Sequence, residues 1–257
     1  MKRSEVSGPW SECLDLLLVF DRFEKFTPPF TQSDDFIFYM NGLIRSTIQY
    51  ARGSRTLILN GNISSADVVA RSAFEHALWA QFFYLHRAEP DLIVKKSLVT
   101  RQSFLERCKD DAEFFKFFIG TTNIQEHEFD DALGEVSSRF ESLNASTALP
   151  SNSAVTKSLR SESSEDFYEL VRIYVQMSQV VHPAACFFMY GKSEDDQIEL
   201  FKDPQSGNPQ STLKALTRCC AWVLAIQEEL LTEDSHIEEL VAITSKFGFQ
   251  PWLRLPS

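Results

Sequence analysis

The sequence predicts an all-α protein, a helical bundle built around long central antiparallel helices. Three observations favour this fold class. Apolar residues recur every three or four positions over long stretches, which is the period of an amphipathic helix. Only 9 of the 257 residues are glycine, and no stretch shows sustained strand alternation with hairpin turns. The 22 phenylalanines predict thick aromatic packing between the helices.

The size of the chain allows one large core or two fused helical lobes, and we expect residues 1–257 to form a single helical domain. Hydrophobic residues make up 44% of the sequence and charged residues 24%, which is ordinary for a globular protein. The formal net charge of −11 disfavours a broad basic surface that could bind nucleic acid. Any contact with RNA therefore has to be local.

The cysteines and the apolar stretches favour a cytoplasmic protein. The five cysteines form no CxxC pair, and the adjacent Cys219 and Cys220 cannot easily bridge each other, so a reducing compartment fits best. The apolar stretch LDLLLVF near the N-terminus is short and contains Asp15, which indicates a helix rather than a secretion signal. No uninterrupted apolar run approaches the roughly 20 residues needed to cross a bilayer, so we expect no membrane span.

Prolines, glycines and turn residues divide the chain into successive helices. Residues 27–29, Thr-Pro-Pro, end the first helix. Residues 60–62, Asn-Gly-Asn, form a turn before the third helix, which Ser64 or Ser65 is expected to cap. Gly120 is expected to close the fourth helix. The expected helices cover residues 9–26, 33–52, 64–87, 91–120, 123–143, 164–191, 211–235 and 237–246.

Residues 144–164 have a different composition from the helices on either side. They are rich in Ser, Thr, Asn and Ala, with Pro150 among them, and such a composition resists a packed core. We therefore expect an exposed linker over 144–164.

The third expected helix carries two charges on an otherwise apolar face. Arg71 and Glu75 lie four residues apart, which places them about 40° from each other around the helix axis. The surrounding letters VVARSAFEHALWAQFFYL would bury both side chains, and buried charges must be paired or used. A simple salt bridge between the two is the structural interpretation, and a polar site is the functional one. Because both charges are expected to be buried, we also expect a partner elsewhere in the fold.

A second polar stripe is expected on the helix that follows the linker. Tyr174, Ser178 and His182 recur every fourth residue and span about 80° of the helix circumference. Pro183 denies an N–H to the carbonyl of Gln179, so His182 is expected at a kink or at a helix end. The structural alternative is that these hydroxyls and this ring are satisfied core groups. We expect this stripe to face Arg71 and Glu75 inside the bundle.

Taken together, RSAFE and YVQMSQVVHP resemble a bacterial all-helical family known only as a domain of unknown function. In that family an Arg-x-x-Phe/Tyr-Glu helix precedes a Tyr-x-x-x-Ser-x-x-x-His helix. The resemblance covers roughly Asn41 to Gly191. It implies an all-helical fold and supplies no agreed activity.

The letters RSAFEH are also similar to the Arg-x(4 to 6)-His motif of the HEPN superfamily, which includes many metal-independent ribonucleases of toxin and phage-defence systems. Arg71 and His76 would supply this motif. This chain departs from it at Ser72, where the superfamily commonly has Asn, Asp or His. On an uninterrupted helix Arg71 and His76 also stand about 140° apart, so a shared site would need a dimer or a local distortion.

The HEPN resemblance implies that RNA is cleaved without a metal ion. His182 or His76 would exchange a proton with a ribose 2′-hydroxyl, and Arg71 would stabilise the developing phosphorane charge. Tyr174 and Glu75 would orient those groups. The alternative is a non-catalytic module, whose buried polar network fixes the helix register and whose outer surface binds a protein partner or a second copy of the chain.

Other familiar sites find no support in the sequence. It contains no GxxxxGK[ST], GxGxxG after a strand, HExxH or GxSxG, so we expect no nucleotide loop, zincin or α/β-hydrolase chemistry. Glu126, His127 and Glu128 form a polar cluster, which we interpret as a solvated helix face rather than a metal site. No cofactor and no metal are expected.

Overall fold

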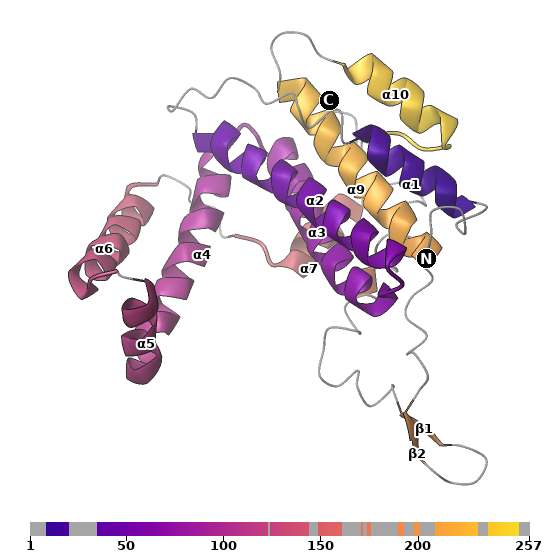
Figure 1. Ribbon diagram of the computed structural model, residues 1–257. Coiled ribbons are helices and arrows are strands. Elements are labelled where there is room, and N and C mark those ends of the chain that lie inside the picture. The colour runs from indigo at the N-terminus through magenta and orange to yellow at the C-terminus, as the bar shows by residue number, and fades with distance from the viewer. Residues whose placement is uncertain are drawn as a thin grey trace. The chain divides into compact units, whose positions relative to one another are not determined.

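The computed structural model has the all-α fold that the sequence predicts (Figure 1). The residues that it describes are 9–20, 35–122, 124–143, 149–160, 171, 174–175, 190–192, 198–200, 209–230 and 236–251. The helices are α1 (Pro9–Phe20), α2 (Asp35–Leu59), α3 (Ile63–Leu85), α4 (Asp91–Asp110), α5 (Ala112–Thr122), α6 (Glu126–Ser142), α7 (Asn152–Arg160), α9 (Pro209–Leu230) and α10 (Ile237–Lys246).

The chain forms two compact units. The first contains Met1–Thr31, Asn41–Leu85 and Ser151–Ser257, and the second contains Gln32–Met40 and His86–Pro150. Helix α2 begins in the second unit and continues into the first.

The core of the first unit lies where α3 packs against α9, which in turn contacts α1 and α10. Apart from Lys214 and Arg218, every residue of α9 from Thr212 to Glu228 is buried. A helix that is apolar on all sides can only be stable when its neighbours surround it. Helix α2 runs antiparallel to α3, as the expected bundle requires, because Ser54 donates a hydrogen bond to the carbonyl of Ala66 while Tyr50 lies against His76.

The second unit is a smaller cluster in which α4 packs against α5 and α6. The ring of Phe115 on α5 meets the ring of Phe129 on α6 edge-on, with the centroids 4.9 Å apart. Arg139 of α6 forms an ion pair with Asp35 at the start of α2. The buried apolar residues of these three helices are Leu92, Ile93, Val94, Leu98, Leu105, Cys108, Phe115, Phe129 and Val136.

The expected helix over 91–120 is wrong, because the chain breaks at Asp111. This residue has an extended backbone (φ −108°, ψ 101°), and its carboxylate oxygen Oδ1 accepts the backbone N–H groups of Glu113 and Phe114 at 3.1 and 3.0 Å. Asp111 therefore caps the start of α5 and separates it from α4. Gly120 does not close the helix either, since α5 continues to Thr122.

The boundaries around the first turn also differ from the expectation. Helix α2 runs past Arg52 to Leu59. Gly61 makes the expected turn with φ 79°, a left-handed conformation that favours glycine. Helix α3 begins at Ile63, so Ser64 and Ser65 lie inside the helix and do not cap it.

Part of the expected linker over 144–164 is helical. Residues 152–160 form α7, which packs on α3, and its Val155 and Leu159 are buried. The indole Nε1 of Trp79 on α3 donates a hydrogen bond to Oδ1 of Asn152 at 2.9 Å. Most of the other described residues of α7 are exposed, while residues 144–148 and 161–164 lie outside the described residues.

The expected helices over 123–143 and 237–246 are confirmed as α6 and α10. The expected end of the first helix near Phe26 and most of the helix over 164–191 lie outside the described residues. A short antiparallel hairpin, β1 (Tyr190–Lys192) and β2 (Ile198–Leu200), stands where that helix was expected to end. In the described part of the chain, no helix is long and apolar enough to cross a membrane.

Candidate functional site

Four residues interrupt the burial of helix α3. From Ala70 to Tyr84 every residue of this helix is buried except Arg71, Ser72, Glu75 and His76, which are half-buried. We call these four residues the polar window. A charged pair and a histidine gathered at the open positions of an otherwise buried stretch of helix are the features expected of a functional site.

Arg71, Glu75 and Tyr174 meet in this window. Nη2 of Arg71 lies 3.0 Å from Oε1 of Glu75, and the hydroxyl of Tyr174 donates a hydrogen bond to the same oxygen at 2.7 Å. The guanidinium carbon of Arg71 is 5.7 Å from the centroid of the Tyr174 ring, within reach of a cation–π interaction. The Tyr174 ring also stacks on Phe74 at a centroid distance of 4.8 Å. The prediction that Arg71 and Glu75 contact the second polar stripe is therefore confirmed for Tyr174.

The remaining members of that stripe, Ser178 and His182, lie outside the described residues. Tyr174 itself belongs to a helical segment, as the expected helix over 164–191 requires.

The environment of the window keeps the Tyr174 phenol protonated and the Arg71 guanidinium charged. Burial raises the pKa of Tyr174 above its ordinary value of 10.0, and the hydrogen bond to Glu75 raises it further, while Arg71 offsets only part of the rise. Burial works to lower the pKa of Arg71, but the contacts with Tyr174 and Glu75 outweigh it, so this pKa is also raised. Tyr174 therefore acts as the donor to the Glu75 carboxylate.

This arrangement predicts how stability depends on pH. The unfolded chain loses the Tyr174 proton near its ordinary pKa of 10.0, whereas the folded chain retains it to higher pH. The stability due to this shift is therefore complete below about pH 10 and is lost as the pH rises through the folded-state pKa. Urea unfolding at about pH 8 and about pH 10.5 should show that Tyr174→Phe, which keeps the ring, loses less stability between the two than the wild type. A parallel decline of the two proteins would contradict the assigned hydrogen bond.

The Arg71 guanidinium has a donor that the described residues do not satisfy. Its Nε atom is buried and has no hydrogen-bond partner among them. The side chains of Arg71 and Glu75 are nevertheless 25% and 27% exposed. Among the described residues, the window is therefore neither closed to solvent nor a completed hydrogen-bond network, although a purely structural network should be both.

His76 is oriented by the helix that carries it. Its Nδ1 lies 2.8 Å from the backbone carbonyl of Ser72. A carbonyl only accepts hydrogen bonds, so Nδ1 carries the proton and Nε2 of the neutral ring presents a lone pair. The ring of Tyr50, which is 40% exposed, lies against the imidazole at a centroid distance of 5.2 Å. This is a suitable arrangement for a group that accepts a proton.

Helix α3 is unbroken from Ile63 to Leu85, so the expected angle of about 140° between Arg71 and His76 is retained. The structure thus brings Arg71, Glu75 and Tyr174 together and places His76 on the adjacent side of α3, against α2. Tyr50 was not predicted. The antiparallel pairing of α2 and α3 about the turn at Gly61 is the signal that would have placed it near His76.

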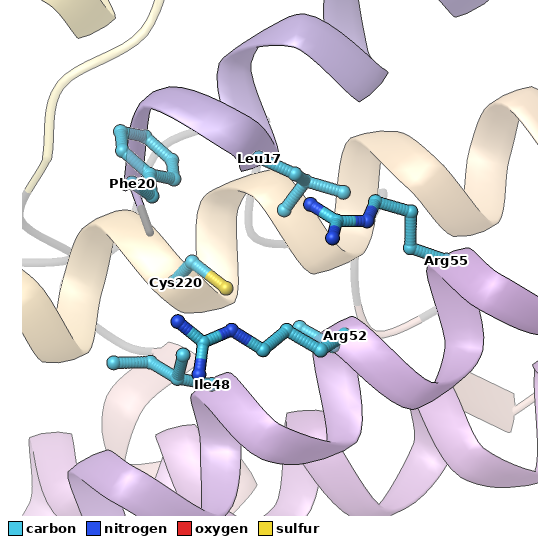
Figure 2. Close-up of a pocket in the computed structure, with 7 residues that line it drawn as sticks. Leu17, Phe20, Ile48, Arg52, Arg55 and Cys220 are labelled. Atoms are coloured by element: carbon cyan, nitrogen blue, oxygen red, sulfur yellow. The ribbon is translucent and has the colours of Figure 1, made fainter. Parts of the chain in front are cut away.

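A small pocket lies between α1, α2 and α9 in the first unit (Figure 2). The side chains of Arg52 and Arg55 line it from α2, and Cys220 lines it from α9. Its volume of about 10 Å³ has room for no more than about one water molecule, so it is too small for an organic ligand.

The described residues contain no cluster of three or more His, Cys, Asp or Glu side chains that could hold a metal ion. Glu126, His127 and Glu128 are all exposed, which confirms their interpretation as a solvated helix face.

Comparisons with known proteins identify a family but no activity. Residues 37–198 match a family of unknown function, DUF5677. The matched range includes both the RSAFE helix and the Tyr174 segment, in agreement with the resemblance seen in the sequence. No curated protein and no solved structure matches the chain.

Proposed function

This chain belongs to DUF5677, a family of unknown function, and from that premise we propose that it is a HEPN-like, metal-independent ribonuclease that binds RNA at the polar window of α3. The observation that carries the proposal is that this window is partly open to solvent and holds a hydrogen-bond donor without a partner among the described residues. Arg71, Glu75 and His76 are half-buried and partly open in the stretch of α3 from Ala70 to Tyr84, which is otherwise buried, and Arg71 Nε has no partner among the described residues. A site that is open and has unused donors is prepared for a ligand.

The proposed chemistry is transesterification at a ribose phosphate. His76 or His182 takes the proton of the 2′-hydroxyl, and the 2′-oxygen attacks the phosphorus. The bond from phosphorus to the 5′-oxygen breaks, that oxygen takes a proton from solvent as it leaves, and the histidine returns its own proton to solvent. The products are one RNA end with a 2′,3′-cyclic phosphate and one with a 5′-hydroxyl, so the reaction consumes neither water nor a cofactor.

The other residues of the window have supporting roles. The Arg71 guanidinium stabilises the negative charge that grows on the phosphate oxygens as the bond to the 2′-oxygen forms. Glu75 holds this guanidinium by an ion pair, and the ring of Tyr174 holds it by a cation–π contact. Arg71 and His76 point in directions about 140° apart around α3. A substrate that contacts both must therefore wrap around this part of the helix; otherwise His182 supplies the base.

The test is cleavage of a mixed RNA pool by the purified full-length chain in the presence of EDTA. We expect the wild type to produce 2′,3′-cyclic phosphate ends. The single variant Arg71→Ala should reduce the rate of cleavage by a factor of about 10² or more, and so should one of the single variants His76→Ala and His182→Ala. A positioned base or charge contributes at least that much to the rate. The control variants are His127→Ala on α6 and Arg107→Ala on α4, which remove an exposed histidine and an exposed arginine far along the chain from the window.

Thermal melting of each variant separates loss of activity from loss of folding. A variant that melts like the wild type but no longer cleaves RNA supports the proposal. If the wild type leaves the RNA pool intact while Arg71→Ala melts at a much lower temperature, the polar window is structural. The non-catalytic interaction module is then the better interpretation.

A further inference from the structure

A second surface, on the smaller unit, has no part in the proposed function. Three phenylalanines of α4 and α5 are largely open to solvent: Phe104 is 54% exposed, Phe114 46% and Phe117 67%. The ring of Phe118 links two of them, with centroid distances of 6.1 Å to Phe104 and 6.2 Å to Phe114. We call Phe104, Phe114 and Phe117, with Phe118 beneath them, the aromatic surface.

Exposed rings at this density are costly unless something covers them. The three open side chains leave on the order of 300 Å² of aromatic area in contact with water. A stable interface buries about 800 Å² on each partner and has an aromatic centre with a polar rim. The aromatic surface therefore has the size and composition of the centre of such an interface rather than of a whole one.

The charges beside these rings indicate what the partner is. Glu113 and Lys116 flank Phe114 and Phe117 on α5, and both are exposed. They lie at i and i+3, where they could pair with each other, yet neither has an ion-pair partner in the described part of the chain. The rim thus offers one free charge of each sign on the same helix.

A second copy of the same helix complements this pattern. If two α5 helices pack antiparallel about a two-fold axis between Phe115 and Lys116, Phe114 of one copy faces Phe117 of the other. Glu113 then lies only about 3 Å along the axis from Lys116 of the other copy, which the long lysine side chain can span. The same two-fold axis therefore pairs the rings of Phe114 and Phe117 across the interface and also pairs each Glu113 with a Lys116 of the other copy.

We propose that the aromatic surface is a self-association interface, in which α5 packs antiparallel against α5 of a second copy of this chain. The expected dimer is weak, with a Kd in the micromolar range, because the aromatic centre is small.

The first measurement is sedimentation equilibrium of the full-length chain over a range of concentrations. We expect a monomer–dimer equilibrium, and we expect Phe117→Ser to weaken it at least tenfold. The matched control is Phe38→Ser, which changes a phenylalanine on α2 that is 53% exposed and outside the aromatic surface, and which should leave the Kd unchanged. A wild type that stays monomeric over the whole concentration range would overturn the proposal, because a second copy then does not cover the rings.

Charge exchange then identifies the partner as a second copy. Glu113→Lys and Lys116→Glu should each weaken self-association, because each places like charges opposite each other across the axis. An equimolar mixture of these two variants should form a mixed dimer in which both charge pairs are opposite again. Circular dichroism melts of each variant confirm that it is folded. If the folded variants do not associate when mixed although the wild type dimerises, the interface is not the proposed α5 pair.

Discussion

Replacing Phe83 with alanine is expected to lower the free energy of unfolding by about 3–5 kcal/mol. Phe83 lies on α3, where it is 2% exposed. Its ring stacks on Trp79 at a centroid distance of 5.2 Å and meets Phe82 edge-on at 5.5 Å. The indole is in turn fixed by its hydrogen bond to Asn152 of α7. Because these neighbours are fixed, the cavity that the substitution leaves cannot easily collapse, and the cost should lie in the upper part of the range for this type of change.

Urea unfolding followed by far-ultraviolet circular dichroism measures this effect. Phe38→Ala is the matched control, because it removes the same side chain from an exposed position on α2, and it should change the free energy of unfolding by less than about 0.5 kcal/mol. If Phe83→Ala is no more destabilising than Phe38→Ala, α3 is not in the core of the first unit.

Thr212→Val is expected to lower the free energy of unfolding by about 1–3 kcal/mol. The Thr212 hydroxyl on α9 donates a hydrogen bond of 2.6 Å to Oδ1 of Asp67 on α3, and both side chains are almost fully buried. Valine has nearly the same shape but no hydroxyl, so the buried carboxylate loses a donor that water cannot replace. The effect therefore reports the polar contact rather than a cavity.

Two substitutions serve as controls for this prediction. Thr212→Ser keeps the hydroxyl and should recover most of the lost stability. Thr56→Val removes the hydroxyl of an exposed threonine on α2, which donates a hydrogen bond to the carbonyl of Arg52 in its own helix, and should be nearly neutral. Equal losses for Thr212→Val and Thr56→Val would show that the contact with Asp67 contributes no stability.

The amphipathic period predicts most of the described helices because their ends carry strong local signals. Helix α10 has the predicted limits, and the turn at Gly61 stands between α2 and α3. The break at Asp111 escapes prediction because two consecutive aspartates fit the polar face of a continuing helix. Only the three-dimensional structure shows that the second of them, Asp111, caps the next helix. Helix α7 escapes because polar residues dominate its composition, while Val155 and Leu159, one turn apart, are enough to pack it on α3.

The sequence predicts those parts of the candidate site that follow from the burial of charged side chains. Arg71 and Glu75 stand among apolar residues of α3, so a polar partner was required, and Tyr174 supplies it. The contact of Tyr50 with His76 depends on the register between two neighbouring helices, which periodicity within one helix does not contain. That the described residues offer Arg71 Nε no partner likewise depends on three-dimensional packing alone.

The backbone break at Asp111 also decides whether the smaller unit has one aromatic surface or a lone ring on α4 that is separated from the three rings on α5. In a continuous helix, Phe104 and Phe118 would stand about 21 Å apart along the axis. The break turns the chain so that their ring centroids are 6.1 Å apart. A side chain at position 111 without a capping oxygen would favour the straight helix and separate the rings, although every phenylalanine would still be present. The capacity of this unit to bind through its rings is therefore set by one polar residue that is not part of the surface.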